Sequence, residues 1–295
     1  MDVFKCFFFC SLETCKALAS AGAKVYLCSR SVSAGEKAVA EEICQPGLGG
    51  YVVDKSNIVV KPLDLQSLPS IKAFADDFLK SESRLDFLVL NAGIMALPTQ
   101  EFTEAGFEKQ IGVNHFGHFY LTQMLLPLMQ SVADSAGRVV VLASSAHAAM
   151  GNMDVNDLHY TKGRTYKAWM AYGQSKLANV LFAKGLGDRT VGTHVTSVSV
   201  HPGVIQTALW RQSMFNRLLG GFIKDKTVPQ GAATTVYGCL CPRVATDGMR
   251  GAYLTDCGPT MPSNMGQDAD KKLREALWKV TEEQLAAAVK KANLL

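Results

Sequence analysis

Short apolar runs alternate along the chain with stretches of helical periodicity, and this alternation limits the fold more than any other feature. The runs Phe87–Leu90 and Val139–Leu142 contain no polar residue. Such runs are typical of strands that are buried on both faces of a parallel sheet. Helical stretches between them have the length that crossovers between parallel strands need. The pattern therefore predicts an α/β fold with a doubly wound parallel sheet.

The expected elements follow from this pattern. We expect strands at Lys24–Ser29, Asn57–Asp64, Asp86–Asn91, Arg138–Ala143, His194–Val200 and Ala252–Thr255. We expect helices at Leu12–Ser20, Ser33–Cys44, Ser67–Lys80, Glu104–Gln130, Tyr166–Gly185, Gln230–Cys239 and Asp270–Ala292. Ser11 is the expected N-cap of the first helix, and Gly22 is expected to end it. No repeat or low-complexity linker interrupts the 295 residues, so residues 12–295 are expected to form a single domain after an atypical segment at residues 1–11.

The stretch Tyr172-Gly-Gln-Ser-Lys176 is the strongest chemical signal. Tyr172 and Lys176 are four residues apart in a predicted helix and therefore share one face. A free tyrosine titrates near pH ~10, and an ammonium beside the phenol favours the phenolate and lowers that pKa. Such a tyrosine can give a proton to a carbonyl oxygen or take one from an alcohol. The alternative is that Tyr172 and Lys176 are only a pair of neighbouring surface residues, and the motifs around them are needed to decide between the two interpretations.

Polar residues and a glycine follow the predicted strands at the sheet edge where α/β proteins bind ligands. Ser144 and Ser145 follow one buried strand, where a hydroxyl can stabilise charge that develops on a substrate oxygen. Gly93 follows another and lets the backbone approach a ligand. Asn114 places an amide within a long predicted helix; its alternative is a structural amide that bonds to the backbone.

Together these motifs resemble the short-chain dehydrogenase/reductase family. The resemblance is strongest to its retinol-dehydrogenase-like branch, which includes the oxidoreductase part of WW-domain-containing oxidoreductases. It rests on "LVLNAG", "VNHFGHFYLTQMLLPLM", "RVVVLASSAH", "AYGQSKLANVLFAKGL", "VSVHPGVIQT" and "PQGAATTVY", and it covers about Leu12 to about Pro262. It implies a Rossmann-like fold and an oxidoreductase that interconverts a carbonyl and an alcohol with a nicotinamide cofactor.

The resemblance also implies a role for each matching residue. Tyr172 would be the general acid and base, and Lys176 its partner and a ligand of the cofactor ribose. Ser145 would orient the substrate carbonyl, with Ser144 as the second choice. Asn114 would hold a water that links Lys176 to solvent. The other implied cofactor contacts are Asn91, Ala92 and Gly93 along the cofactor, Asp64 and Leu65 beside adenine, and Pro202, Gly203 and Thr207 at the nicotinamide end.

Arg30 bears on the choice of cofactor. Chains of this fold carry an acid at the end of the second strand to bind the ribose of NAD, whereas an arginine there suits the 2′-phosphate of NADP. Ser29-Arg30-Ser31 offers no acid, and a guanidinium forms paired bonds to phosphate. We therefore expect NADP(H) rather than NAD(H). The alternative is an arginine that only faces solvent.

Residues 208–227 match the position of the family's substrate loop. They include the apolar residues Trp210, Met214, Phe215, Leu218, Leu219 and Phe222. Apolar anchors favour a lipophilic carbonyl or alcohol of the retinoid, steroid or aldehyde type. Two alternatives are open. One is an amphipathic helix that faces the core, and the other is shallow membrane contact, because Arg211, Arg217, Lys224 and Lys226 flank the apolar groups.

The first eleven residues contain no glycine, although the family carries Thr-Gly-x-x-x-Gly-x-Gly there. Those glycines let backbone N–H groups touch the cofactor pyrophosphate. Phe9 aligns with the end of the motif, so no cofactor role is assigned to this segment. We expect the first strand to be replaced or degraded, with Val3–Phe8 in its central slot, because an empty slot would expose two sheet edges. The following turn should be only two or three residues long.

Two explanations for the missing motif are open: a replaced or mis-assigned first exon, or a natural variant that binds its cofactor weakly. Both predict an intact catalytic set of Asn114, Ser145, Tyr172 and Lys176 beside a damaged phosphate site. The alternative function is therefore a catalytically impaired family member that acts as an interaction protein.

Charge and cysteine pattern argue against several other classes. The net charge is +4 with scattered basic residues, so no nucleic-acid partner is expected. There is no Cys-x-x-Cys, and His115 and His118 share a helix face without a third ligand, so no metal site is expected. The run Val3–Cys10 is far shorter than a span of about 20 residues, which favours a cytoplasmic chain. The resemblance implies a homodimer packed through the helices at 104–130 and 166–185.

Overall fold

The computed structural model describes residues 2–6, 9–44, 53–132, 135–205 and 226–294, with side chains from Leu12 onward. Eight strands form one sheet in the order β3-β2-β1-β4-β5-β6-β7-β8. They are β1 Asp2–Cys6, β2 Lys24–Ser29, β3 Ile58–Pro62, β4 Phe87–Leu90, β5 Arg138–Leu142, β6 Thr196–His201, β7 Ala252–Thr255 and β8 Gly258–Thr260. All neighbours are parallel except β7 and β8. The predicted doubly wound parallel sheet is confirmed.

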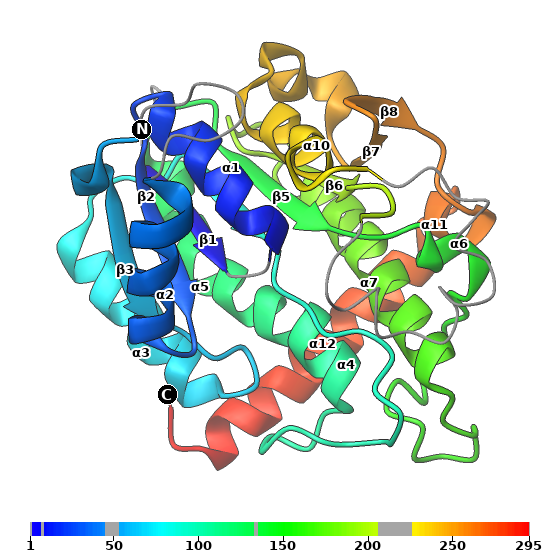
Figure 1. The fold of residues 1–295 in the computed structure, drawn as a ribbon. Helices are drawn as coiled ribbons and strands as arrows, with labels where there is room; N and C mark the ends of the chain where they lie inside the picture. The colour runs from blue at the N-terminus through cyan, green and yellow to red at the C-terminus, as the bar shows by residue number, and fades with distance from the viewer. Residues whose placement is uncertain (1, 7–8, 45–52, 133–134, 206–225, 295) are drawn as a thin grey trace.

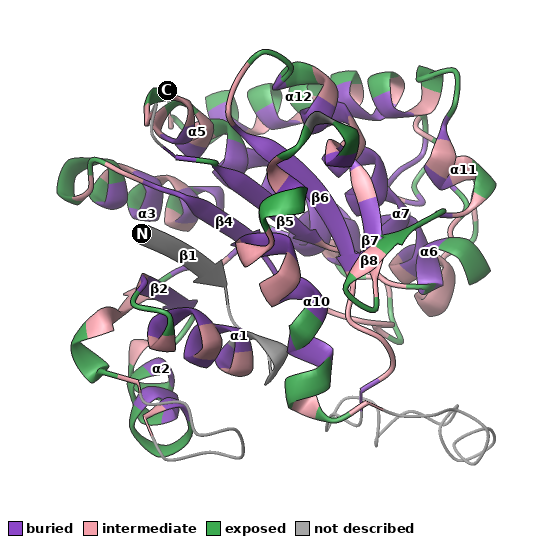
Figure 2. Ribbon diagram, turned by 90° about the horizontal axis from the view of Figure 1, so that it is seen from above, coloured by how far each residue is buried: buried purple, intermediate pink, exposed green. Residues whose placement is uncertain are grey.

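Helices cover both faces of the sheet (Figures 1 and 2). One layer contains α1 Phe9–Ser20, α2 Val32–Ala38 and α10 Val228–Leu240, which close a core around Leu18, Leu27 and Val140. The other contains α3 Leu68–Ser81, α5 Gly117–Ser131, α7 Ala168–Arg189 and α12 Lys272–Lys291, around a core that includes Leu88 and Phe119. Short helices α4 Lys109–Ile111, α6 Ala146–Ala149 and α11 Asn264–Gln267 lie in the connections.

The opening segment occupies the central slot of the sheet. β1 pairs in parallel with β2 and with β4, and Val3 lies opposite Val25 on one side and Phe87 on the other. This confirms that residues near the N-terminus form the first strand. β1 ends at Cys6 and α1 begins at Phe9, and the two residues that join them lie outside the described ranges. Because α1 begins before Ser11, the predicted N-cap is wrong, and Ser11 belongs to the helix.

The helix expected at Glu104–Gln130 is not continuous. It is divided into α4, a π-helical turn at Gly112–Phe116 and α5. Residues 104–107 are not helical, because Gly106 has a φ of +84° and Phe102 forms a β-bridge with Glu108. The helix expected at Ser33–Cys44 is likewise interrupted by a π-helical turn at Val39–Ile43. Turns of this kind insert a residue into a helix and are common at functional sites.

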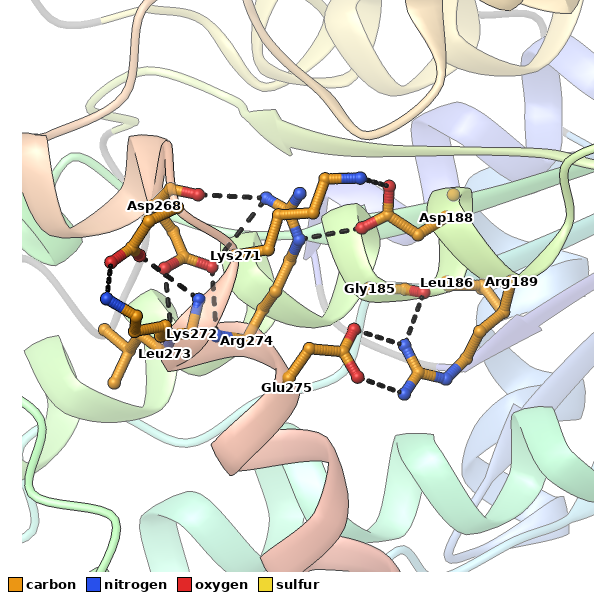
Figure 3. A network of polar contacts seen from close by, with 12 residues as sticks. Gly185, Leu186, Asp188, Arg189, Asp268, Lys271, Lys272, Leu273, Arg274 and Glu275 are labelled. Atoms are coloured by element: carbon orange, nitrogen blue, oxygen red, sulfur yellow. Dashed lines mark hydrogen bonds and ion pairs between the residues drawn. The ribbon is translucent and has the colours of Figure 1, made fainter.

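Helix α12 packs across the outer face of α5 and α7. Trp278 lies with its ring centroid 4.7 Å from that of Phe119 and 5.7 Å from that of Phe182. The start of α12 is held to the end of α7 by ion pairs, shown in Figure 3, between Arg274 and Asp188 and between Glu275 and Arg189. Helix α12 therefore occupies part of the surface of the two helices through which the resemblance implies dimer packing, and the homodimer stays a prediction. None of the helices described here is long and apolar enough to cross a bilayer.

Candidate active site

A cavity of about 610 Å³ opens where β2, β3 and β4 end. Arg30 follows β2, Asp64 and Leu65 follow β3, and Ala92 and Gly93 follow β4, and all five line it. These positions come from three distant parts of the sequence, so the fold brings most of the predicted adenine-side residues together. Asn91 is buried beneath them, and its backbone N–H donates to the Val89 carbonyl at 3.1 Å.

The polar lining of this cavity includes Asp64 and Arg30, which were predicted, and Glu42, which sequence reasoning missed. Asp64 uses one carboxylate oxygen to accept the Gln66 N–H at 3.0 Å, and Arg30 is exposed and makes no ion pair within the described part of the chain. Glu42 also lines the cavity. It belongs to the π-helical turn at Val39–Ile43, and nothing in the helical periodicity indicates that an exposed glutamate would be brought to this edge.

Helix α7 presents Tyr172 and Lys176 next to this cavity. The Lys176 ammonium donates to the Leu142 carbonyl at 3.0 Å and lies 5.8 Å from the centroid of the Tyr172 ring. A Cβ atom at Gly93 would lie 3.4 Å from Lys176 Nζ and 3.0 Å from Asn114 Oδ1. Because Gly93 also lines the cavity, the cavity and the catalytic candidates are neighbours.

Ser144 is the serine whose side chain acts on the Tyr172 phenol. Its hydroxyl acts to lower the Tyr172 pKa, while Ser145 is exposed at the start of α6. The sequence favours Ser145 as the residue that orients the substrate carbonyl, and this role stays a prediction. Pairing between β5 and β6 continues to Ala143, as expected, and the Ala143 N–H donates to the Val200 carbonyl at 2.8 Å. Ser144 and Ser145 follow directly, and Ser144 Oγ accepts the Ala146 N–H at 3.2 Å in the turn.

Burial dominates the protonation of the two α7 residues. It raises the pKa of Tyr172 to about 12, and the nearby Ser144 side chain acts in the opposite direction. Burial lowers the pKa of Lys176 to about 8. The lowering of the Tyr172 pKa expected from the ammonium is therefore wrong for this structure. At neutral pH the pair consists of a phenol and an ammonium, which suits proton donation to a carbonyl oxygen.

Asn114 lies in the π-helical turn at Gly112–Phe116 and is fully buried. Its Oδ1 accepts the Ile94 N–H at 2.8 Å, and its Nδ2 donates to the Ile94 carbonyl at 2.9 Å and to Ser175 Oγ at 2.8 Å. The amide therefore clamps the segment after β4 to the helix that carries Tyr172. The water-holding role stays a prediction, whereas these contacts are those of the structural alternative.

The nicotinamide-side residues are placed only in part. Pro202 and Gly203 follow β6, and Gly203 has a φ of +88°. This left-handed backbone conformation favours glycine, whereas the 2.7 Å contact that a Cβ atom would make is with the flexible end of the Lys226 side chain. Lys226 is ion-paired with Asp256. Thr207 and residues 208–225 of the expected substrate loop lie outside the described residues.

His115 and His118 each have a partner of their own, and no third ligand joins them. His115 Nε2 lies 3.0 Å from Thr281 Oγ1, and His118 Nδ1 lies 3.1 Å from the Asn114 carbonyl oxygen. Burial lowers the pKa of both to about 3. Among the residues from Leu12 onward that are described, no three side chains of the metal-binding type gather. A third histidine, His147, contacts the Ser144 carbonyl and was missed, because the sequence motif does not reveal its partners.

Comparison with known proteins points to one family. The family model described as "short chain dehydrogenase" matches residues 11–157. Mouse "Retinol dehydrogenase 11" is 40% identical over 271 residues, which cover 91% of this chain and 80% of that protein. Human "Retinol dehydrogenase 12" is 39% identical over 279 residues, which cover 92% and 82%.

Solved structures show the same fold. A protein from Mycobacterium paratuberculosis superposes with a TM-score of 0.74 at 31% identity, over 96% of this chain and 92% of that chain. An NADPH-bound carbonyl reductase from chicken fatty liver superposes with a TM-score of 0.62 at 19% identity, over 88% of this chain and 98% of that chain. The likeness to the second concerns the fold alone.

Proposed function

Because the chain belongs to the short-chain dehydrogenase family of oxidoreductases, we propose that it interconverts a carbonyl and an alcohol with NADP(H) as cofactor. The observation that carries this proposal is that Tyr172, Lys176 and Ser144 converge. The Lys176 ammonium lies 5.8 Å from the centroid of the Tyr172 ring, and the Ser144 side chain is close enough to the phenol to lower its pKa. This arrangement adjoins the cavity through Gly93. A proton donor, an oxygen-binding hydroxyl and a fixed positive charge are the groups that carbonyl reduction requires of a protein.

The proposed mechanism uses these groups in one step. The chemistry that a bound nicotinamide would supply is hydride transfer to or from the carbonyl carbon. The Ser144 hydroxyl donates a hydrogen bond to the substrate oxygen, and Tyr172 gives its proton to that oxygen during reduction. The Lys176 ammonium stabilises the phenolate that remains. For alcohol oxidation, Tyr172 takes the proton back.

The lining of the cavity supports NADP(H). Arg30 is exposed at the end of β2 and has no carboxylate partner among the described residues, so its guanidinium is available for a 2′-phosphate. Ser29 and Ser31 flank it on the same cavity wall and offer hydroxyl donors. Glu42 on the opposite segment is the one acidic lining residue besides Asp64. Arg30 is therefore the residue that we propose to select the phosphorylated cofactor.

We propose a lipophilic substrate of the retinoid, steroid or aldehyde type. Two of the relatives named above are retinol dehydrogenases, and residues 208–227 carry six large apolar side chains in the sequence. Such side chains favour an apolar ligand. A cytoplasmic location and peripheral contact with a membrane are further proposals from the sequence.

The decisive test is Tyr172→Phe in an assay with NADPH and all-trans-retinal. The variant should lose turnover while its affinity for NADPH, measured by tryptophan fluorescence, stays within about twofold. Tyr120→Phe is the matched control, because Tyr120 lies on α5 near Lys72 and Asp76 of α3. If Tyr172→Phe reduces retinal at the wild-type rate, the proton-transfer role is wrong.

One observation favours a second candidate, an impaired enzyme that acts through protein contacts. Residues 1–11 contain no glycine, and only two residues join β1 to α1. Each lost N–H bond to a charged phosphate removes roughly 1.5–3 kcal/mol of binding. If a folded protein gives no saturable fluorescence change up to millimolar NADPH, this candidate replaces the first.

A further inference from the structure

We propose that His147 is a positioning residue that ties Ser144 to the segment entering α11 through the two nitrogens of one neutral imidazole. The inference rests on the proposed function, because it assigns to Ser144 the task of binding the substrate oxygen. His147 itself is two residues beyond the exposed Ser145 and is 2% exposed. The hydrogen bonds of its ring go to Ser144 and Ser263 and not to Tyr172, so its effect on the reaction is indirect.

The ring joins three elements. His147 Nδ1 lies 2.6 Å from the Ser144 carbonyl oxygen, and Nε2 lies 3.0 Å from the Ser263 backbone nitrogen. The ring also packs against Tyr253 of β7, with centroids 4.9 Å apart and an interplanar angle of 62°. The end of β5, strand β7 and the start of α11 therefore meet at one side chain.

The two partners fix the protonation state of the ring. A carbonyl oxygen only accepts, so Nδ1 must carry a hydrogen. A backbone N–H only donates, so Nε2 must be unprotonated. Of the two neutral tautomers and the imidazolium, one tautomer alone satisfies both contacts. Burial lowers the pKa of His147, which favours a neutral ring.

The contact at Nδ1 acts on the backbone of Ser144. The Ser144 carbonyl accepts a hydrogen bond from the backbone N–H of His147 at 3.1 Å as well as from the ring nitrogen, and the Ser144 hydroxyl accepts the Ala146 N–H at 3.2 Å. Ser144 stands between β5 and α6, outside both elements, so these bonds are what set its orientation. Loss of the ring bond leaves one of the two bonds to this carbonyl.

The contact at Nε2 acts on a segment that is anchored at its far end. Ser263 caps α11 by accepting the Gly266 N–H at 3.2 Å, and Asp268 is the C-cap residue that follows the end of α11 at Gln267. The Asp268 carboxylate accepts the N–H groups of Leu273 and Arg274 at 3.0 Å each, and Arg274 is paired with Asp188 of α7, as Figure 3 shows. Contacts therefore run from Ser144 through His147 and α11 back to the helix that carries Tyr172. His147 closes this circuit and so helps to set the position of Ser144 relative to Tyr172.

Two substitutions separate the two halves of the bridge. His147→Asn places an amide nitrogen near the position of Nδ1 and keeps a donor for Ser144, but it offers nothing to Ser263. His147→Gln reaches one carbon further and keeps an acceptor for Ser263, but it loses the donor. With NADPH and all-trans-retinal, we expect the kcat of His147→Asn to exceed that of His147→Gln by about 10-fold, with KM values within about twofold of each other. Hydrogen exchange at the Ser263 amide should be faster than wild type in His147→Asn only.

A second pair of variants leaves His147 in place and serves if the first pair does not fold. Ser263 has a φ of −53°, which proline adopts without strain. Ser263→Pro removes both the N–H donor and the capping hydroxyl, whereas Ser263→Ala removes only the hydroxyl. A lower kcat in Ser263→Pro than in Ser263→Ala therefore reports the bond to Nε2.

The outcomes are distinct. Equal kcat values for the two His147 variants, or for the two Ser263 variants, overturn the positioning role. Unchanged exchange at the Ser263 amide in His147→Asn overturns the bridge itself. If the wild-type protein does not reduce retinal at all, the proposed function fails, and the exchange measurement still decides whether His147 holds Ser263.

Discussion

Mild acid should unfold this protein because its histidines are buried in the neutral form. Five of the six histidines have a pKa lowered chiefly by burial, to about 3 for His115 and His118 and about 4 for His201. An unfolded histidine has a pKa of about 6.5, so the unfolded chain binds more protons between the two values. The free energy of unfolding therefore rises with pH across this interval and falls as the pH drops below about 6.5.

The size of the effect follows from these values. Between pH 7 and pH 5, a histidine whose pKa falls from about 6.5 on folding to about 3 removes about 2 kcal/mol of stability. A folded pKa of about 4 gives nearly the same result, since both lie below pH 5. His115, His118 and His201 together then remove about 6 kcal/mol, which is comparable with the whole stability of an ordinary domain. Glu108 acts in the opposite direction, because burial raises its pKa.

Urea unfolding at pH 7, 6 and 5 measures this loss directly. His118→Asn should reduce the loss between pH 7 and pH 5 by about 2 kcal/mol, whatever its effect on stability at pH 7. Thr122→Val is the matched control, because Thr122 is buried on the same helix and does not titrate. A free energy of unfolding that is constant from pH 7 to pH 5 would refute the reasoning, and so would an equal change of pH dependence in the two variants.

Four further predictions concern the cofactor site, the serine pair, α12 and the oligomeric state. Arg30→Ala should raise the KM for NADPH by about 10-fold or more and leave that for NADH within about twofold, as initial rates would show; equal effects on both cofactors contradict the 2′-phosphate contact. Ser144→Ala should lower kcat by about 100-fold, whereas Ser145→Ala should keep it within about threefold; the reverse order would restore Ser145 to the site. Trp278→Ala should cost about 3–5 kcal/mol in urea unfolding, because the indole is 9% exposed between Phe119 and Phe182. Light scattering on the wild-type protein tests the homodimer that the resemblance implies. Because α12 packs on the outer face of α5 and α7, a dimer that persists in Trp278→Ala does not depend on the packing of Trp278 against these helices.

Sequence patterns predicted the sheet better than the details of the site. β2 and β7 begin and end at the predicted residues, because their apolar runs are bounded by polar residues and glycines. The position of β1 in the centre of the sheet was predicted because an empty position there would expose two sheet edges. The π-helical turn that holds Asn114 could not be predicted, since an inserted residue changes the periodicity only locally.

The direction of the Tyr172 pKa could not be predicted for a related reason. Sequence spacing shows that Lys176 is near, and proximity alone favours the phenolate. It does not show that the phenol is desolvated, nor that the ammonium is bonded to the Leu142 carbonyl. Burial outweighs the charge, so the pKa moves upward.

The missing glycines affect the two halves of the site differently. β1 pairs with β2 and β4 through backbone hydrogen bonds, which require no particular side chain, so the sheet tolerates a changed sequence there. The groups around Tyr172 are held by Asn114, Leu142 and His147, none of which depends on residues 1–11. Pyrophosphate contacts, by contrast, require backbone that only glycine permits to approach so closely. The loss should therefore appear in the affinity for the cofactor and leave the chemical step intact, so kcat extrapolated to saturating NADPH should be far less affected than kcat/KM for NADPH.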